Sequence, residues 1–353
     1  MLRTVKRAIL TALAAPGVTA PFYPLTRGRA TVFMLHRFRD ADRGVQGDDP
    51  ALVRCALELL HGRGFEFVAL ADLFARLRGE GRPLRRAVAF TIDDGYAEQA
   101  GVGLPAFGAF DCPVTTFVTT GFLDGRLWFW WDQITWVLRQ TRRKRLVVTV
   151  AGERLELAWD ADAERRHAGE RFVARCKTVP ESERVAAIGR LASEADVPLP
   201  AAPPPEYAPM TWDELRAWEA RGMSFGPHTV THPILSRTDD TQSRREIVDS
   251  WTRLRQGARA PVPVFCYPNG GWGDFGVREI ATIREAGLAG AVIGEWGIAD
   301  SRDVRSADPD AAYRVPRIPW SGALPYTVQY VSGVEVAKLW LRGLAGRRSP
   351  SFA

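Results

Sequence analysis

Long apolar runs are absent from this sequence. The best candidate, Ala8 to Ala20, is interrupted by Pro16 and Gly17, whereas a membrane-spanning helix needs roughly 20 apolar residues. No spanning helix is therefore expected. The same stretch has a basic flank and small residues like those of a weak secretory signal, with Ala14 or Ala20 near the cleavage point. Export is thus the alternative to a location in the cytoplasm or at the inner face of the membrane.

Cysteine is also scarce. The four cysteines, Cys55, Cys112, Cys176 and Cys266, show no paired spacing, which argues against a disulfide framework and against a zinc knuckle. We expect reduced, buried thiols.

Short apolar strands alternate with amphipathic helices over most of the 353 residues, of which 46% are apolar. A first strand is predicted from Ala30 to Leu35, and a helix from Ala51 to His61 is ended by Gly62 and Gly64. Further strands are predicted at residues 66–70, 87–92, 114–119, 223–226, 262–267 and 289–293, and further helices at 71–78, 212–221, 243–256 and 276–286. The alternation predicts an α/β fold, with a parallel sheet or barrel wrapped by helices.

The alternation breaks between Trp128 and Pro205. This region holds an aromatic cluster from Trp128 to Trp131, a basic run, a hairpin pattern and charged helices, and a Pro-rich connector closes it. We interpret residues 128–205 as an insertion that divides the main domain into residues 30–127 and 206–330. Its tryptophans suit either a sugar-binding cleft or ordinary core packing, and core packing is the favoured interpretation.

Both ends of the chain, residues 1–29 and 331–353, are basic. The first acid is Asp40, and after Glu335 the only charged residues are cationic, with Lys338 and Arg342 among leucines and Trp340. Such a basic amphipathic helix suits an anionic surface, either a membrane leaflet or nucleic acid, but it can equally pack Trp340 on its own domain. Nucleic acid ranks lower because no recognition motif accompanies these charges.

Two adjacent acids, Asp93 and Asp94, follow an apolar strand and precede Gly95. In parallel α/β folds the carboxyl ends of the strands form the floor of the active site. Neighbouring side chains on an extended segment point in different directions, so one carboxylate can bind a cation while the other faces a substrate. The alternative is a surface turn, since Asp-Asp-Gly is a common turn sequence.

Two of the five histidines, His228 and His232, follow another predicted strand. They lie on one face if this segment turns helically, and they can then share a metal. With Asp94 they form a set of two imidazoles and one carboxylate, which leaves positions open for water and substrate, as in catalytic sites. Zn²⁺ is the first expectation, and Co²⁺, Ni²⁺, Mn²⁺ or Fe²⁺ would fit the same ligands.

Two further strand ends carry candidate residues. The strand at 262–267 ends in a glycine-rich loop with Tyr267, Pro268, Asn269 and Trp272, and no Lys-Ser or Lys-Thr pair follows its glycines, which excludes a phosphate loop. The loop can form a wall on which a sugar ring stacks, or it is merely a tight turn. His36, at the end of the first strand, should lie on the same rim as Asp93.

Together these residues resemble the polysaccharide deacetylase family, which shares the NodB homology domain and is carbohydrate esterase family 4-like. In that family a Thr-Phe-Asp-Asp-Gly motif supplies a catalytic base and a metal-binding aspartate, and a His-Ser/Thr-x-x-His segment supplies two more ligands. Here these are Thr91 to Gly95, with Ile92 at the Phe position, and His228 to His232. The resemblance covers roughly Ala30 to Pro319 outside the insertion, and it implies an irregular (β/α) barrel of the NodB type.

The chain departs from this family at two points. Many members have an Arg-containing third motif and a late histidine that acts as general acid, but no histidine follows His232 here. Some relatives begin with a strand ending in Tyr-His, which Leu35-His36 resembles, and His36 is therefore the candidate for the acid. Arg317 is a candidate partner for the substrate or for a carboxylate.

The resemblance implies a metal-dependent hydrolase that removes N-acetyl groups from an amino sugar in a polysaccharide or lipid-linked glycan, such as a glycan of the bacterial cell envelope. Asp93 would be the general base, and a backbone N–H near Tyr96 would help to hold the oxyanion. Two rivals stay open. One is an amidase for a small cyclic amide or ureide on the same scaffold, and the other is a metal-containing protein that binds glycans without cleaving them. The sequence does not predict the oligomeric state.

Overall fold

A curved, mainly parallel sheet forms the centre of the main domain. The computed structural model describes residue 15 and residues 17–344. The strands of the sheet are β1 (Arg29–Leu35), β2 (Glu66–Phe67), β3 (Ala87–Asp94), β4 (Val114–Val118), β7 (Ser224–Pro227), β10 (Ala299–Asp300) and β11 (Ile318–Pro319). β1, β3, β4 and β7 pair in parallel in that order, and the short β10 pairs antiparallel with β1.

A two-stranded parallel sheet leads from β7 back to β1. It consists of β8 (Val264–Cys266) and β9 (Gly290–Val292). On one side the Val262 N–H donates to the Phe225 carbonyl of β7, and on the other the Ile293 N–H donates to the Val315 carbonyl. β11 then pairs in parallel with β1. This ring confirms the predicted irregular (β/α) barrel.

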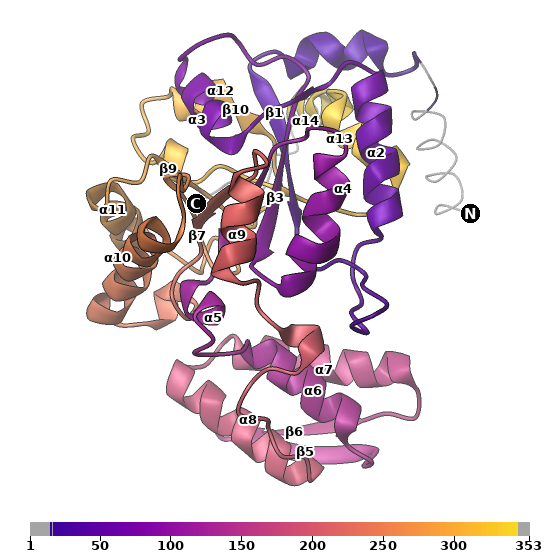
Figure 1. Ribbon diagram of the computed structural model, residues 1–353, viewed down its shortest axis with the longest axis vertical. Coiled ribbons are helices and arrows are strands. Elements are labelled where there is room, and N and C mark those ends of the chain that lie inside the picture. Colours follow the sequence, from indigo (N-terminus) through magenta and orange to yellow (C-terminus); the bar gives the residue numbers. More distant parts are fainter. Residues whose placement is uncertain (1–14, 16, 345–353) are drawn as a thin grey trace.

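Helices surround the sheet, as Figure 1 shows. They are α2 (Pro50–Gly62), α3 (Leu70–Arg78), α4 (Leu104–Gly108), α5 (Thr120–Leu123), α9 (Trp212–Glu219), α10 (Asp240–Gly257), α11 (Val277–Glu285), α12 (Ser301–Val304) and α13 (Leu324–Val331). β3 has a neighbouring strand on each edge and all eight of its residues are buried, which agrees with its nearly continuous apolar run.

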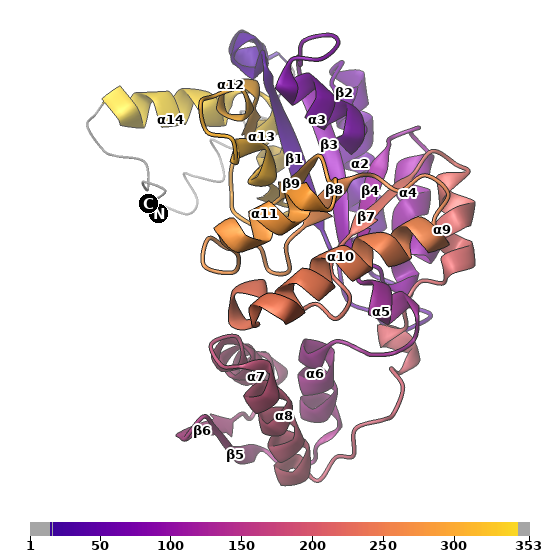
Figure 2. The ribbon, with the colours of Figure 1, turned by 90° about the vertical axis from the view of Figure 1, so that its left-hand side faces the viewer.

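Residues within the predicted insertion form a second, smaller hydrophobic core. Its elements are α6 (Trp130–Gln140), the antiparallel hairpin β5 (Arg145–Val150) and β6 (Glu153–Ala158), α7 (Asp162–Cys176) and α8 (Glu181–Ala195). Ile134, Leu146, Leu157 and Phe172 are fully buried inside it. This unit lies at one end of the long axis of the molecule, below the barrel in Figures 1 and 2.

The two ends of the described chain lie at the other end of the barrel. They are the 3-10 helix η1 (Ala20–Thr26) and α14 (Val334–Leu344). Most of the predicted basic N-terminal segment, the cleavage point near Ala14 and the last arginines of the C-terminal tail lie outside the described residues. Within the described part, no helix combines the length and the apolar character needed to cross a membrane.

All four cysteines are free, and Cys112, Cys176 and Cys266 are buried as predicted. The expectation of burial is wrong for Cys55, which is exposed. Cys55 lies on α2, which buries its opposite face through Val53, Ala56 and Leu57.

Candidate active site

A cavity of about 420 Å³ lies where the barrel meets the smaller unit. Its lining comes from the carboxyl ends of β1 and β3, from the loop after β7, and from α6 and α7. Lys177, directly after α7, also contributes. The cavity lining contains seven of the predicted residues, namely His36, Asp93, Asp94, Tyr96, His228, His232 and Asn269. Tyr267, Pro268, Trp272 and Arg317 do not line it.

The end of β3 separates the two adjacent carboxylates. Asp94 has a φ of +88° and Gly95 a φ of +93°. Residues other than glycine rarely adopt such a left-handed backbone conformation. A Cβ at Gly95 would lie 2.7 Å from the Leu123 side chain, so glycine is required by both space and conformation. The sharp change of direction lets Asp93 and Asp94 face different partners.

A loop, and not a helical turn, brings the two histidines together. The predicted helical geometry is wrong, because Thr229 and His232 have φ values of +65° and +59°. The Thr229 hydroxyl accepts the N–H of His232 at 3.0 Å. A tight, strained loop therefore turns both imidazoles toward Asp94.

Glu246, on α10, holds this loop from outside the cavity. Its carboxylate accepts the N–H groups of Val230 and Thr231 at 2.8 and 2.9 Å and the Thr231 hydroxyl at 2.6 Å. No pattern in the sequence points to Glu246, because a lone glutamate on a helix gives no local sign of the backbone it will contact.

Asp94, His228 and His232 have the geometry of a metal site. The Nε2 atoms of the histidines are 3.1 Å apart, and each lies 3.6 to 3.7 Å from Asp94 Oδ1. Tetrahedral Zn²⁺ with bonds of about 2.0–2.1 Å places its ligand atoms roughly 3.3 Å apart. The residues present thus fit a zinc-sized ion.

Protonation also favours metal binding at these three residues. Burial lowers the pKa of His228 to about 4 and lowers that of His232 well below its ordinary value, so both imidazoles are neutral near pH 7. The His228 Nδ1–H donates to the Cys266 carbonyl at 2.7 Å, which leaves the Nε2 lone pair for an ion, as in most histidine-metal sites. Burial and the neighbouring Asp93 raise the pKa of Asp94, and a cation would favour its ionised form.

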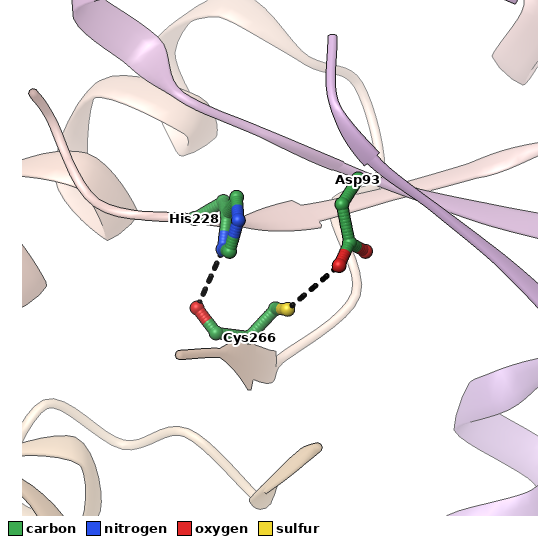
Figure 3. A group of neighbouring side chains, drawn as sticks. All are labelled: Asp93, His228 and Cys266. Carbon is green, nitrogen blue, oxygen red and sulfur yellow. Dashed lines mark hydrogen bonds between the residues drawn. The ribbon is translucent and has the colours of Figure 1, made fainter. Parts of the chain in front are cut away.

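A second group, Asp93, His228 and Cys266, is also close enough to share an ion. Figure 3 shows these side chains around the end of β8. The Arg317 guanidinium, however, donates to both the Cys266 sulfur, at 3.1 Å, and the Asp93 carboxylate. Burial also raises the pKa of the Cys266 thiol well above its ordinary value. A cation already occupies this place, and this second group does not suit a metal.

Asp93 makes a buried, two-pronged ion pair with Arg317. The two guanidinium nitrogens lie 2.7 and 2.8 Å from the two carboxylate oxygens. Burial alone would raise the pKa of Asp93, but the charge and hydrogen bonds of Arg317 outweigh it and lower the pKa below its ordinary value. His36 Nε2 lies 3.8 Å from Asp93 Oδ2, and its side chain is half-exposed at the cavity.

The aromatic cluster divides between the core and the cavity. Phe129 is buried in the core, whereas Trp131 lines the cavity. The Trp131 ring stacks on Phe129 at 4.4 Å and meets the His232 ring edge-on at 4.7 Å. Its indole N–H donates to the Tyr96 hydroxyl, which donates to Asp132 at 2.7 Å.

The glycine-rich loop contributes less to the cavity than expected. Tyr267 is fully buried, stacks on Phe275 at 3.9 Å and donates its hydroxyl to the Tyr313 carbonyl. It therefore packs in the core and offers no surface for a sugar. Trp272 is 39% exposed but outside the cavity lining, and Asn269 alone of this group reaches it.

The family model described as polysaccharide deacetylase matches residues 180–288, a stretch that contains both histidines and Glu246. The chain carries a polysaccharide deacetylase domain. This match confirms the resemblance predicted from the motifs, to a family of hydrolases that act on amide carbon–nitrogen bonds in glycans.

Two solved structures share the fold of this deacetylase. The Streptococcus pyogenes deacetylase PplD, in complex with acetate, is 15% identical, and the match covers 87% of this chain and 99% of PplD with a TM-score of 0.55. IcaB from Ammonifex degensii is 14% identical, with coverages of 86% and 97% and a TM-score of 0.53. Among curated protein sequences, none matches this chain.

Proposed function

We propose that this deacetylase uses a divalent metal, with Zn²⁺ as the first choice, to remove N-acetyl groups from amino sugars of a polysaccharide or lipid-linked glycan. The observation that carries the proposal is the convergence of three ligand atoms from Asp94, His228 and His232 at the cavity. They lie beside a carboxylate, Asp93, that is held ionised by Arg317.

Each residue around the cavity has a distinct part in the proposed reaction. A bound Zn²⁺ supplies Lewis acidity and lowers the pKa of water from 15.7 to about 7. Asp93 accepts the proton of the attacking water, and the Arg317 fork fixes the direction of its lone pairs. His36 Nε2, 3.8 Å from Asp93 on the cavity rim, is the proposed donor of a proton to the departing amine; burial lowers the pKa of this imidazole, and the Asp93 charge acts to raise it. The backbone near Tyr96 is the proposed donor to the oxyanion.

The cavity also favours a sugar over a small cyclic amide. Trp131 and its neighbour Trp130 contribute aromatic rings to its lining, and His36, Asp93 and Asp94 contribute polar groups. His36 and Lys177 in its lining are exposed, so the cavity opens to solvent. A sugar unit of a longer chain can enter such an opening, whereas a small ureide would be better held in a closed pocket.

The alternative of a binding protein without activity fits the geometry less well. Holding a glycan requires neither a metal-ligand set with open positions nor a buried ion pair that keeps Asp93 ionised beside it.

Metal dependence tests the proposal directly. Protein stripped with a chelator should release no acetate from N-acetylglucosamine oligomers, and stoichiometric Zn²⁺ or Co²⁺ should restore release. Unchanged release from the stripped protein would contradict the proposed role of the metal.

A further inference from the structure

An exposed apolar surface lies at the end of the barrel away from the cavity. We call it the terminal patch and define it by the exposed large apolar side chains in or next to η1 and in α14, namely Val18, Leu25, Leu339, Trp340 and Leu341. In the described part of the chain these five make up half of the large apolar side chains that are exposed. The three on α14 are consecutive, with exposed fractions of 37%, 67% and 58%. Such clustering typically marks an interaction site.

The patch is built from both ends of the chain. α14 packs against η1, which precedes β1. Gly333, with a φ of +88°, allows this approach, because a Cβ there would lie 2.4 Å from the Phe22 carbonyl oxygen. Figure 2 shows α14 extending from the barrel, at the opposite end of the molecule from α6, α7 and α8.

The net positive charge of the chain comes from the same two ends. Residues 1–29 and 336–353 contain nine of the 47 lysines and arginines and none of the 41 acids, so the rest of the chain has a net charge of −3. Among those that the structure describes, Arg29 pairs with Asp300 and Lys338 with the buried Glu335. The terminal segments thus carry the whole positive excess of the protein.

We propose that the terminal patch binds the surface of an anionic phospholipid bilayer, with Trp340 and Leu341 inserted at the level of the headgroups. A helix that combines basic residues with exposed Trp and Leu is typical of interfacial membrane binding, and Lys and Arg near it add attraction to anionic lipid. A second copy of this chain is a poorer occupant, because it would bring the same positive charge. Nucleic acid would leave the apolar side chains without a partner.

This mode of binding fixes the direction in which the cavity faces. β1 begins at Arg29, directly after η1, and leads to His36 at the cavity. Seven residues at about 3.3 Å each span roughly 23 Å. The cavity therefore opens away from the bilayer, toward glycan in the aqueous phase. This consequence rests on the proposed function and favours a polymer over a sugar attached next to the lipid.

Sedimentation of the full chain with vesicles tests the proposal without any assay of activity. We expect binding to vesicles of phosphatidylcholine with phosphatidylglycerol, little binding to phosphatidylcholine alone, and weaker binding as salt is raised. The double variant Trp340→Ser/Leu341→Ser should bind at least about tenfold more weakly. The matched control is Val185→Ser/Val277→Ser, which changes exposed apolar residues on α8 and α11 and should bind like the unchanged protein.

The proposal is overturned if the anionic vesicles do not sediment the protein, or if the Trp340/Leu341 variant binds as well as its control. It is also overturned if the protein forms a dimer in solution and the only effect of the Trp340/Leu341 variant is to dissociate that dimer. Release of acetate from a soluble oligomer should be the same for free and vesicle-bound protein. A loss of release on binding would contradict the inferred direction of the cavity while leaving membrane binding itself established.

Discussion

Arg317 and Asp93 form a two-pronged ion pair at the base of the cavity, although 224 positions separate them in the sequence. Arg317 is among the largest fully buried side chains, and it also donates to the Thr91 hydroxyl and the Ile293 carbonyl. Two buried charges are tolerated only when each has its partners. The pair thus links the stability of the barrel to the ionised state of Asp93.

Replacement of Arg317 by Met should therefore affect both stability and activity. We expect the free energy of unfolding to fall by about 3–5 kcal/mol, because Asp93 would remain buried without a counter-charge. Acetate release should be lost, since the pKa of Asp93 would rise. Urea unfolding followed by circular dichroism measures the first effect. Arg302→Met is the control: Arg302 pairs with Asp300 but is 74% exposed, and its loss should cost less than about 1 kcal/mol.

Glu246 should control metal affinity although it touches no ligand atom. In Glu246→Gln the amide oxygen can still accept the Val230 and Thr231 N–H groups, but the negative charge and the acceptor of the Thr231 hydroxyl are lost. We expect Zn²⁺ affinity to fall by about 10- to 100-fold, measured by competition with a chromogenic chelator. Glu285→Gln, which removes an exposed partner of Arg244, is the matched control. Equal affinities in the two variants would show that the loop keeps its shape without Glu246.

The pH dependence of the free energy of unfolding should reveal the raised pKa of Asp132. Burial raises the pKa of this carboxyl to about 7, even though Arg37 and the Tyr96 hydroxyl act to lower it. Between about pH 4 and pH 7 the folded protein holds a proton that the unfolded chain has released. The stabilising contribution is thus complete below pH 4 and is lost as the pH rises through 7, with a slope of at most about 1.4 kcal/mol per pH unit.

Asp132→Asn should remove this slope and still accept the Tyr96 hydrogen bond. The comparison is the free energy of unfolding of the unchanged protein and of this variant at pH 5 and pH 7.5. Relative to the unchanged protein, the variant should have a higher free energy of unfolding at pH 7.5 than at pH 5. A constant difference would contradict the raised pKa.

Trp131 should contribute to substrate binding more than to metal binding. In Trp131→Ala an aromatic ring of the cavity lining is lost, together with the contact to the His232 ring and the hydrogen bond to Tyr96. We expect KM for N-acetylglucosamine oligomers to rise by about tenfold, equivalent to roughly 1.4 kcal/mol, while the protein still binds one Zn²⁺. A fall in kcat at unchanged KM would instead assign Trp131 to the positioning of His232.

The residues that the sequence identified lie where local patterns are strong. An apolar run before Asp93 and Asp94 predicts a buried strand whose end carries acids, and the short spacing of His228 and His232 predicts that they meet. Their geometry could not be predicted in the same way, because the loop depends on left-handed residues and on a glutamate from a distant helix. Long-range contacts decide these details.

Contacts between distant parts of the sequence also decide the places of Arg317 and Tyr267. The sequence predicts that Arg317 is a partner of substrate or of a carboxylate, but only the pairing of β11 with β1 brings its side chain under Asp93. Tyr267 lies at the end of an apolar strand, where a cavity position and a core position have the same local pattern. Its burial against Phe275 follows from the packing of α11 and its preceding loop, which the strand itself does not encode.

The most direct test of the proposed chemistry compares Asp93→Asn with the unchanged protein, both loaded with one equivalent of Zn²⁺, on N-acetylglucosamine oligomers. Asn keeps the size of the side chain but cannot accept the proton from water. The account predicts that the variant still binds Zn²⁺ and that its rate of acetate release falls by about 10²–10⁴-fold. Release by the variant at the rate of the unchanged protein would contradict the account.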